Sequence, residues 1–140
     1  MKLINFNFKK ISVDKIANSY KDLNLSTKIN ISEILPIESK FFKGDEDLVK
    51  VKFSYIIDYS PNIAKVELNG ELVLAIEKTL SKGIIEAWKE KKITDDFRLT
   101  LFNLILRKST VKALELEEEM NLPLHIPPPT LKKPEKKEKE

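Results

Sequence analysis

The chain has 140 residues, of which 41% are hydrophobic and 34% are charged. This length suits one compact domain, and the hydrophobic share is large enough for a core, which excludes a wholly disordered chain. The sequence contains no cysteine and only one histidine. Disulfides, iron–sulfur clusters, thiolate zinc sites and cysteine nucleophiles are therefore excluded, and we expect no metal site and no cofactor.

The formal net charge of +3 suggests a nucleic-acid partner at first sight. Residues 132–140 carry five lysines and three glutamates, however, and so account for most of the excess. Nucleic-acid interfaces usually gather arginines and exposed aromatic residues on one surface, and the chain has only Arg98 and Arg107. The composition therefore argues against nucleic acid as a partner, although an RNA- or DNA-binding accessory protein with a lysine-rich surface remains the alternative function.

No long apolar segment followed by small residues stands near the N-terminus, so the sequence predicts no signal peptide. No segment reaches the roughly 18 apolar residues that a transmembrane helix needs. We expect a cytoplasmic protein without membrane insertion.

Alternation of apolar and polar residues predicts strands in the first part of the chain. A first strand covers residues 3–8, and the polar residues 11–24 predict a short helix or an irregular connection. A second strand begins at residue 25 and continues irregularly to Phe41, with Pro36 marking a bulge or an edge position.

The clearest alternation covers residues 49–59, after a turn at residues 43–47. The next segment offers a choice, because Asn69-Gly70 can form a two-residue hairpin. Such a hairpin would mix apolar and polar residues on both faces, whereas one strand over residues 64–76 places its apolar residues on one face. The continuous strand is therefore preferred, and Gly70 then marks a kink, a bulge or a point of close packing.

From Thr79 the apolar spacing changes to that of an amphipathic helix, which extends to about Trp88. A second helix starts at Thr94-Asp95-Asp96, where a capping group and acidic side chains suit a helix N-terminus. It continues to about Met120 and stops at Asn121-Leu122-Pro123. Its apolar stripe is broad, which suggests contact with more than the sheet, such as a partner subunit. We expect residues 124–131 to be extended and the charged residues 132–140 to form a disordered tail.

A catalytic set is not visible in the sequence, so we expect no enzyme. The three glycines are far apart and cannot form a phosphate-binding loop. His125 lies in a proline-rich segment and is interpreted as exposed or partly packed rather than as a base. The glutamates at positions 115 and 117–119 are interpreted as a solvated face, with a partner-facing patch as the alternative. Only a polar pocket lined by Asp58, Tyr59, His125 or this acidic helix end would revive the hypothesis of an enzyme.

The third and fourth strands carry a broad aromatic and aliphatic face. The ordinary interpretation is a core covered by the long helix, but one helix leaves part of a four-stranded sheet uncovered. Large exposed apolar grooves mark peptide-binding sites or oligomer interfaces. The candidate peptide-binding groove consists of Phe53, Tyr55, Ile57, Tyr59, Leu72, Leu74, Trp88 and Phe102.

The order of four strands, two helices and an extended Leu-Pro segment resembles the SecB export-chaperone family. Residues 97–123 running into residues 124–131 resemble that family's C-terminal helix and extended stretch, and residues 50–76 resemble its two long antiparallel strands. The resemblance implies an α+β fold, with a four-stranded antiparallel sheet followed by two helices in a single domain over residues 1–131. It also implies a homo-oligomer, either a dimer or a tetramer. The implied function is an ATP-independent holdase that binds unfolded or precursor polypeptides in apolar grooves between sheet and helices.

Overall fold

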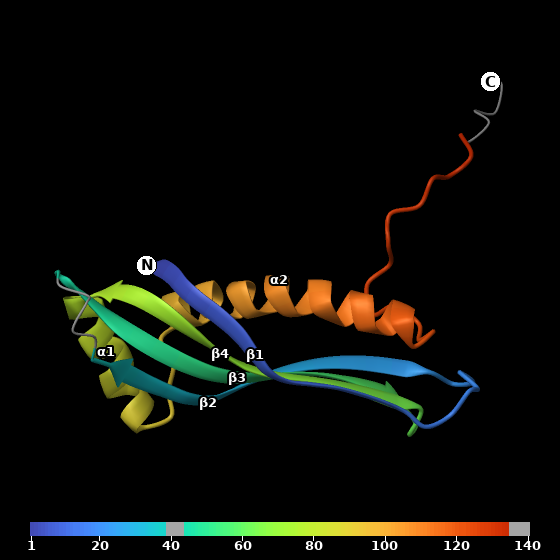
Figure 1. Ribbon diagram of the computed structural model, residues 1–140, viewed down its shortest axis with the longest axis horizontal. Coiled ribbons are helices and arrows are strands. Elements are labelled where there is room, and N and C mark those ends of the chain that lie inside the picture. The colour runs from blue at the N-terminus through green and yellow to red at the C-terminus, as the bar shows by residue number, and fades with distance from the viewer. Residues whose placement is uncertain (39–43, 135–140) are drawn as a thin grey trace.

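The structure is a computed structural model that describes residues 1–38 and 44–134. The strands are β1 (Lys2–Lys15), β2 (Asn24–Ile37), β3 (Glu46–Ser60) and β4 (Ala64–Glu77), and the helices are α1 (Lys78–Lys89) and α2 (Asp95–Glu119). The strands form one antiparallel sheet in the order β1-β4-β3-β2. Helix α2 runs along one face of this sheet and α1 lies at one end (Figure 1). The predicted fold, four antiparallel strands followed by two helices, is confirmed.

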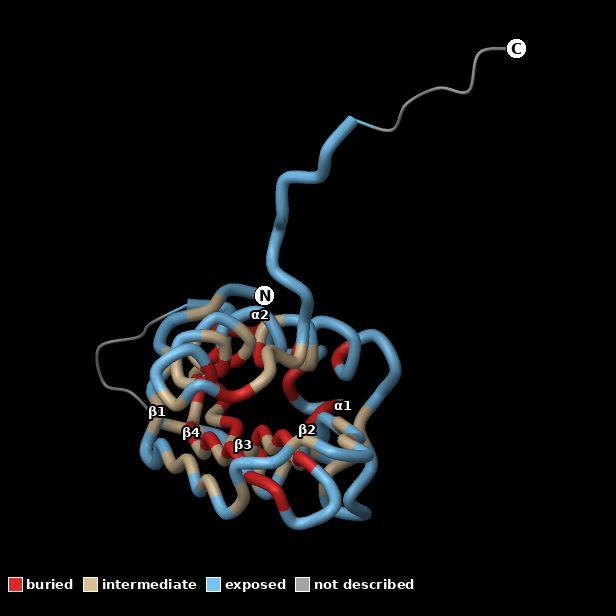
Figure 2. Tube along the Cα trace, turned by 90° about the vertical axis from the view of Figure 1, so that its right-hand side faces the viewer, coloured by how far each residue is buried: buried red, intermediate tan, exposed pale blue. Residues whose placement is uncertain are grey.

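The two central strands supply most of the core. Every second residue of β3 from Val49 to Tyr59 is buried, and the residues of β4 that pair with them are buried as well. The register places Tyr55 opposite Leu68 and Ile57 opposite Val66. Each large aliphatic side chain buried in this way contributes roughly 1.5–3 kcal/mol. Figure 2 shows the buried segments gathered between the sheet and α2.

Strand β4 runs without interruption through Asn69 and Gly70, so the predicted continuous strand is confirmed. Gly70 marks a close approach, because a Cβ atom there would lie 2.6 Å from the carbonyl oxygen of Asn7 and 2.8 Å from Cζ of Phe53. The bulge lies opposite, in β1, where the pairing passes from Phe8–Gly70 to Lys10–Asn69. The absence of a side chain at Gly70 thus lets the Phe53 ring and the bent β1 backbone meet.

The prediction for residues 11–24 was wrong in its first part, because β1 continues to Lys15. Ile11 and Val13 pair with Leu68 and Val66 of β4, so this polar segment is held as a strand by a partner distant in sequence. Strand β2 ends at Ile37, and most of its predicted continuation to Phe41 lies outside the described residues. The residues 135–140 of the predicted disordered tail also lie outside them.

Both ends of α2 lie where the sequence predicted. Thr94 is the N-cap residue, but its hydroxyl makes no capping hydrogen bond, and only Asp95 and Asp96 support the first turn. At the other end Asn121 adopts a φ of 53°. The Leu122 N–H donates to the carbonyl oxygen of Glu117 at 2.8 Å and the Asn121 N–H to that of Glu118 at 3.3 Å, which is a Schellman motif.

The buried residues of α2 recur at every fourth position. A row of this spacing is inclined to the helix axis, so it follows a twisted sheet better than a straight apolar stripe would. The row ends in a carboxylate, and that residue begins the candidate site. The buried row consists of Phe97, Leu101, Ile105, Ser109, Ala113 and Glu117.

Candidate functional site

The end of α2 contains a buried polar cluster. The side chain of Glu117 is fully enclosed and accepts a hydrogen bond from the Tyr59 hydroxyl. The backbone N–H of His125 donates to Glu117 Oε2 at 3.1 Å, and His125 Nδ1 lies 2.6 Å from Glu117 Oε1. The other ring nitrogen, Nε2, lies 3.0 Å from the Tyr55 hydroxyl. We call these four residues, Tyr55, Tyr59, Glu117 and His125, the Glu117 cluster.

The Glu117 cluster surrounds a carboxylate with donors. Burial raises the pKa of Tyr59 above its ordinary value, and the hydrogen bond to Glu117 raises it further; burial also raises the pKa of Tyr55. Both phenols therefore keep their protons. Because an ionised carboxylate only accepts hydrogen bonds, the 2.6 Å contact suits a proton-bearing Nδ1 of His125 as a donor to Glu117 Oε1. Within the described residues, His125 is the basic side chain that pairs with Glu117.

The segment that carries His125 folds back against the body after α2. We call residues 121–126 the strap. The Lys15 ammonium donates to the carbonyl oxygen of Met120 at 3.0 Å, and the Tyr20 hydroxyl donates to that of Asn121 at 2.7 Å. Leu122 is 5% exposed, the His125 side chain is 5% exposed, and the chain beyond the strap leaves the body (Figure 1). The positive charge of Lys15 at the C-terminal end of α2 also offsets the unfavourable charge of the glutamates in the last turn of that helix.

The sequence interpretation missed Glu117, which was grouped with a solvated acidic face. Glu115, Glu118 and Glu119 are exposed, but Glu117 is buried. Its position in the four-residue row that begins at Phe97 was a signal that could have identified it. Tyr59, His125 and the helix end do meet, whereas Asp58 belongs to the opposite face of β3. The groups that meet are enclosed rather than set around a pocket.

Six of the eight candidate groove residues are at most 2% exposed and lie in the core of the single chain. Trp88 and Phe102 are partly exposed and pack at the border of that core. The role of these eight residues in a binding groove stays a prediction. The six core residues are Phe53, Tyr55, Ile57, Tyr59, Leu72 and Leu74.

Partly exposed apolar side chains flank the core on the two outer strands, and we call them the apolar margins. Phe6 packs against Phe8 and Phe53, with ring centroids 5.2 Å apart in each pair. Since β1 and β2 are the edge strands, each margin lies beside a strand edge that no other described strand covers. The margins consist of Leu3, Phe6 and Phe8 on β1 and of Ile29 and Ile31 on β2.

The opposite face of the sheet is polar, and many of its lysines are paired. Lys10 lies 2.9 Å from Glu67, Lys52 3.2 Å from Glu33, and Lys9 3.5 Å from Glu71. The Lys10 hydrogen bond is the main reason why the pKa of Glu67 is lowered. A hollow of about 500 Å³ on this face is lined by side chains of both charges. These pairs reduce the positive field that a nucleic acid would need.

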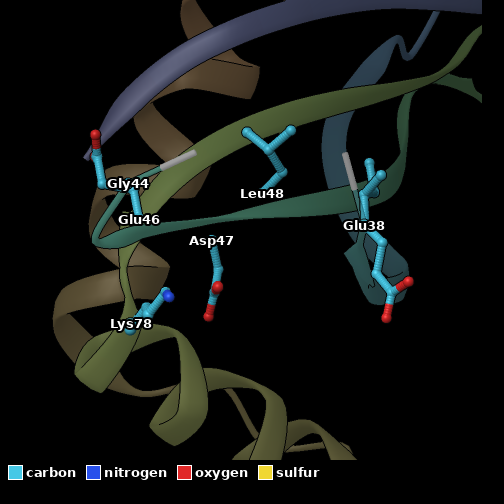
Figure 3. A pocket seen from close by; sticks show the side chains of 7 residues that line it. Glu38, Gly44, Glu46, Asp47, Leu48 and Lys78 are labelled. Atoms are coloured by element: carbon cyan, nitrogen blue, oxygen red, sulfur yellow. The ribbon is translucent and has the colours of Figure 1, made fainter. Parts of the chain in front are cut away.

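A smaller hollow of about 220 Å³ lies near the start of α1. Asp47, Glu38 and Lys78 are among the residues that line it (Figure 3). Within the described residues, no group of three or more His, Cys, Asp or Glu side chains could hold a metal ion. No helix in the same part of the chain is long and apolar enough to cross a membrane.

Comparison with known proteins identifies a similar structure but no similar sequence. No family model matches the sequence, and no curated protein matches it. Among solved structures, the chain is similar to a SecB-like chaperone of Mycobacterium tuberculosis, Rv1957, solved in complex with a ChAD peptide from the Rv1956 HigA1 antitoxin. The similarity covers 96% of this chain and 92% of that chain, with a TM-score of 0.52 and 8% sequence identity. The chain therefore has the fold of a SecB-like chaperone.

Proposed function

We propose that the protein is a cytoplasmic, ATP-independent holdase that binds unfolded or precursor polypeptides, and that it acts as a dimer or tetramer. The observation that carries the proposal is the pair of apolar margins beside open strand edges. An extended polypeptide can add its backbone to such an edge and place alternate side chains against the neighbouring apolar residues. Trp88 and Phe102 on the helices are also partly exposed and pack against the same core as the margin residues.

The similar fold of Rv1957, which was solved with a bound peptide, supports a polypeptide as the ligand. The paired lysines of the polar sheet face weaken the alternative of a nucleic-acid binder. If the alternative is correct, RNA or DNA binds at low salt and the affinity falls linearly in log[salt].

The proposal is tested by diluting a chemically denatured client protein into buffer with and without this protein, in the absence of nucleotide. We expect light scattering by the aggregating client to be suppressed at roughly stoichiometric ratios. Phe6→Ser and Ile31→Ser, one in each margin, should each weaken this suppression severalfold because they remove apolar contact area. Ile16→Ser, at a position 62% exposed outside the margins, is the matched control.

Circular dichroism of each variant verifies that it is folded. The proposal is wrong if the wild-type protein leaves client aggregation unchanged. The assignment to the margins is wrong if folded margin variants suppress aggregation as well as Ile16→Ser does.

A further inference from the structure

The strap and the Glu117 cluster have the chemistry of a peptide bound to a receptor. We infer that Tyr55, Tyr59 and Glu117 form a subsite for which the strap is a built-in ligand. The same subsite accepts, from another polypeptide, a residue with an imidazole or basic side chain. This inference rests on the proposed function and specifies which polypeptide segments the protein prefers.

The recognition uses two groups of a single residue. The backbone N–H and the ring of His125 both reach the carboxylate of Glu117, at 3.1 Å and 2.6 Å. Any residue except proline offers the first donor, but only a residue with a side-chain donor of suitable reach offers the second. Three residues earlier, buried Leu122 supplies an apolar anchor. The preferred segment is therefore an apolar residue followed, three positions later, by histidine, lysine or arginine.

The charge of the subsite sets the selectivity. Glu117 is fully buried, and its basic partner among the described residues is His125. When the strap leaves, the carboxylate keeps the Tyr59 hydroxyl but loses both donors of His125. A buried carboxylate that has lost most of its donors is strongly unfavourable, so the strap leaves most readily when an incoming segment brings equivalent donors. A glutamate in the place of His125 would be repelled.

The strap is suited to exchange because it belongs to no helix or strand. Its last residue, Ile126, is exposed, as are residues 127–134 after it, so the strap can leave without breaking a strand. Its departure frees one side of Tyr55 and Tyr59, since His125 contacts the first and the Pro123 carbonyl lies 2.8 Å from the hydroxyl of the second. Two residues of the candidate groove would thereby become available to a bound polypeptide.

Binding of a fluorescent peptide with the sequence of residues 121–131, NLPLHIPPPTL, tests the inference on the full chain. A tethered segment competes at an effective concentration of about millimolar, so the peptide should bind wild-type protein weakly. His125→Ala weakens the competing strap, and we expect the peptide to bind this variant at least about tenfold more tightly. A peptide with arginine in place of the histidine should keep this affinity, and peptides with alanine or glutamate there should lose it. The double variant Glu117→Gln/His125→Ala should not discriminate among the four peptides.

Equal binding of the histidine, alanine and glutamate peptides would overturn the inference, as would equal affinity for wild type and folded His125→Ala. If His125→Ala does not fold, the same ranking of peptides is measured on wild-type protein at higher peptide concentration. The client-aggregation assay separates the two proposals. A protein that holds clients but does not discriminate among the peptides retains the proposed function and lacks this subsite. A protein that ranks the peptides but holds no client has the subsite without the holdase function.

Discussion

Glu117 occupies the last position of an otherwise largely apolar row on α2, where a carboxylate must lose its hydration. The structure compensates with three donors, the Tyr59 hydroxyl, the His125 backbone N–H and the His125 ring. Removal of one partner from a buried charged group usually costs more than the pair contributes, because the remaining partners are left unsatisfied. The cluster therefore joins helix, sheet and strap in a single arrangement.

The substitution Glu117→Gln tests the contribution of the cluster to stability, because glutamine has nearly the same shape as glutamate but no charge. The amide presents an NH₂ group to atoms that are themselves donors, so at least one hydrogen bond is lost inside the protein. We expect the free energy of unfolding in urea to fall by about 1–3 kcal/mol. The matched control is Glu118→Gln on the exposed side of α2, which should stay within about 0.5 kcal/mol of wild type. Equal stability of the two variants would contradict the structural role of the cluster.

The two buried tyrosines predict the behaviour at alkaline pH. Burial raises the pKa of Tyr59 and of Tyr55 in the folded state, whereas in the unfolded chain each tyrosine has a pKa of about 10. Above that pH the unfolded state binds fewer protons than the folded state, so stability falls as pH rises. The limiting slope is about 1.4 kcal/mol per pH unit for each tyrosine.

Urea unfolding between neutral and strongly alkaline pH measures this slope. We expect Tyr59→Phe to show a shallower alkaline decline than wild type, because one of the two groups is gone. Parallel curves for the two proteins would show that Tyr59 does not contribute to the decline.

At the scale of elements, we expect opposite effects on stability from alanine substitutions at Gly70 in β4 and at Gly83 in α1. In Gly70→Ala the new Cβ would meet the Asn7 carbonyl and the Phe53 ring, and the backbone atom cannot move freely within the sheet. We expect a loss of about 1–3 kcal/mol in the free energy of unfolding. Gly83 lies within α1 with nothing within 4 Å of an added Cβ, so Gly83→Ala should gain about 0.5–1 kcal/mol.

Thermal and urea unfolding of both alanine variants provide the measurement. Each variant is the control for the other, since the chemical change is identical. A neutral Gly70→Ala would mean that β1 and β4 do not approach as closely as the structure has them.

At the scale of the whole molecule, α2 carries exposed apolar side chains outside its buried row. Leu99 is 66% exposed and Leu106 is 42% exposed. Exposed apolar groups on one helix face often mark contact with another chain. We predict that the protein is a dimer or tetramer in solution, and that Leu99→Asp/Leu106→Asp shifts it toward the monomer.

Light scattering coupled to gel filtration measures the mass, against 16.2 kDa for one chain. The control is Ile16→Asp, an equally apolar exposed position in the connection between β1 and β2. A wild-type protein with the mass of one chain would rule out the predicted oligomer. An unchanged oligomer in the double variant would place its interface elsewhere, for example at the open edges of the sheet.

The sequence predicted most of the fold because its signals are local. Strand β3 and both helix ends follow from periodicity and from residues such as Asn121 and Pro123 that stop a helix. The end of β1 was missed because Ile11 and Val13 carry a weak pattern of their own and become a strand through pairing with β4. The partial exposure of the margins depends on how much of the sheet a single helix covers, which no local pattern states.

By itself the sequence determined that this protein has four strands followed by two helices, no cysteine chemistry and a strong apolar face on its central strands. Only the tertiary structure decided that six of the candidate groove residues lie in the core and that the single histidine joins a buried carboxylate. The physical reason is distance along the chain. Periodicity acts within an element, whereas Glu117 takes its donors from Tyr59, 58 residues earlier, and from His125, eight residues later across a helix end.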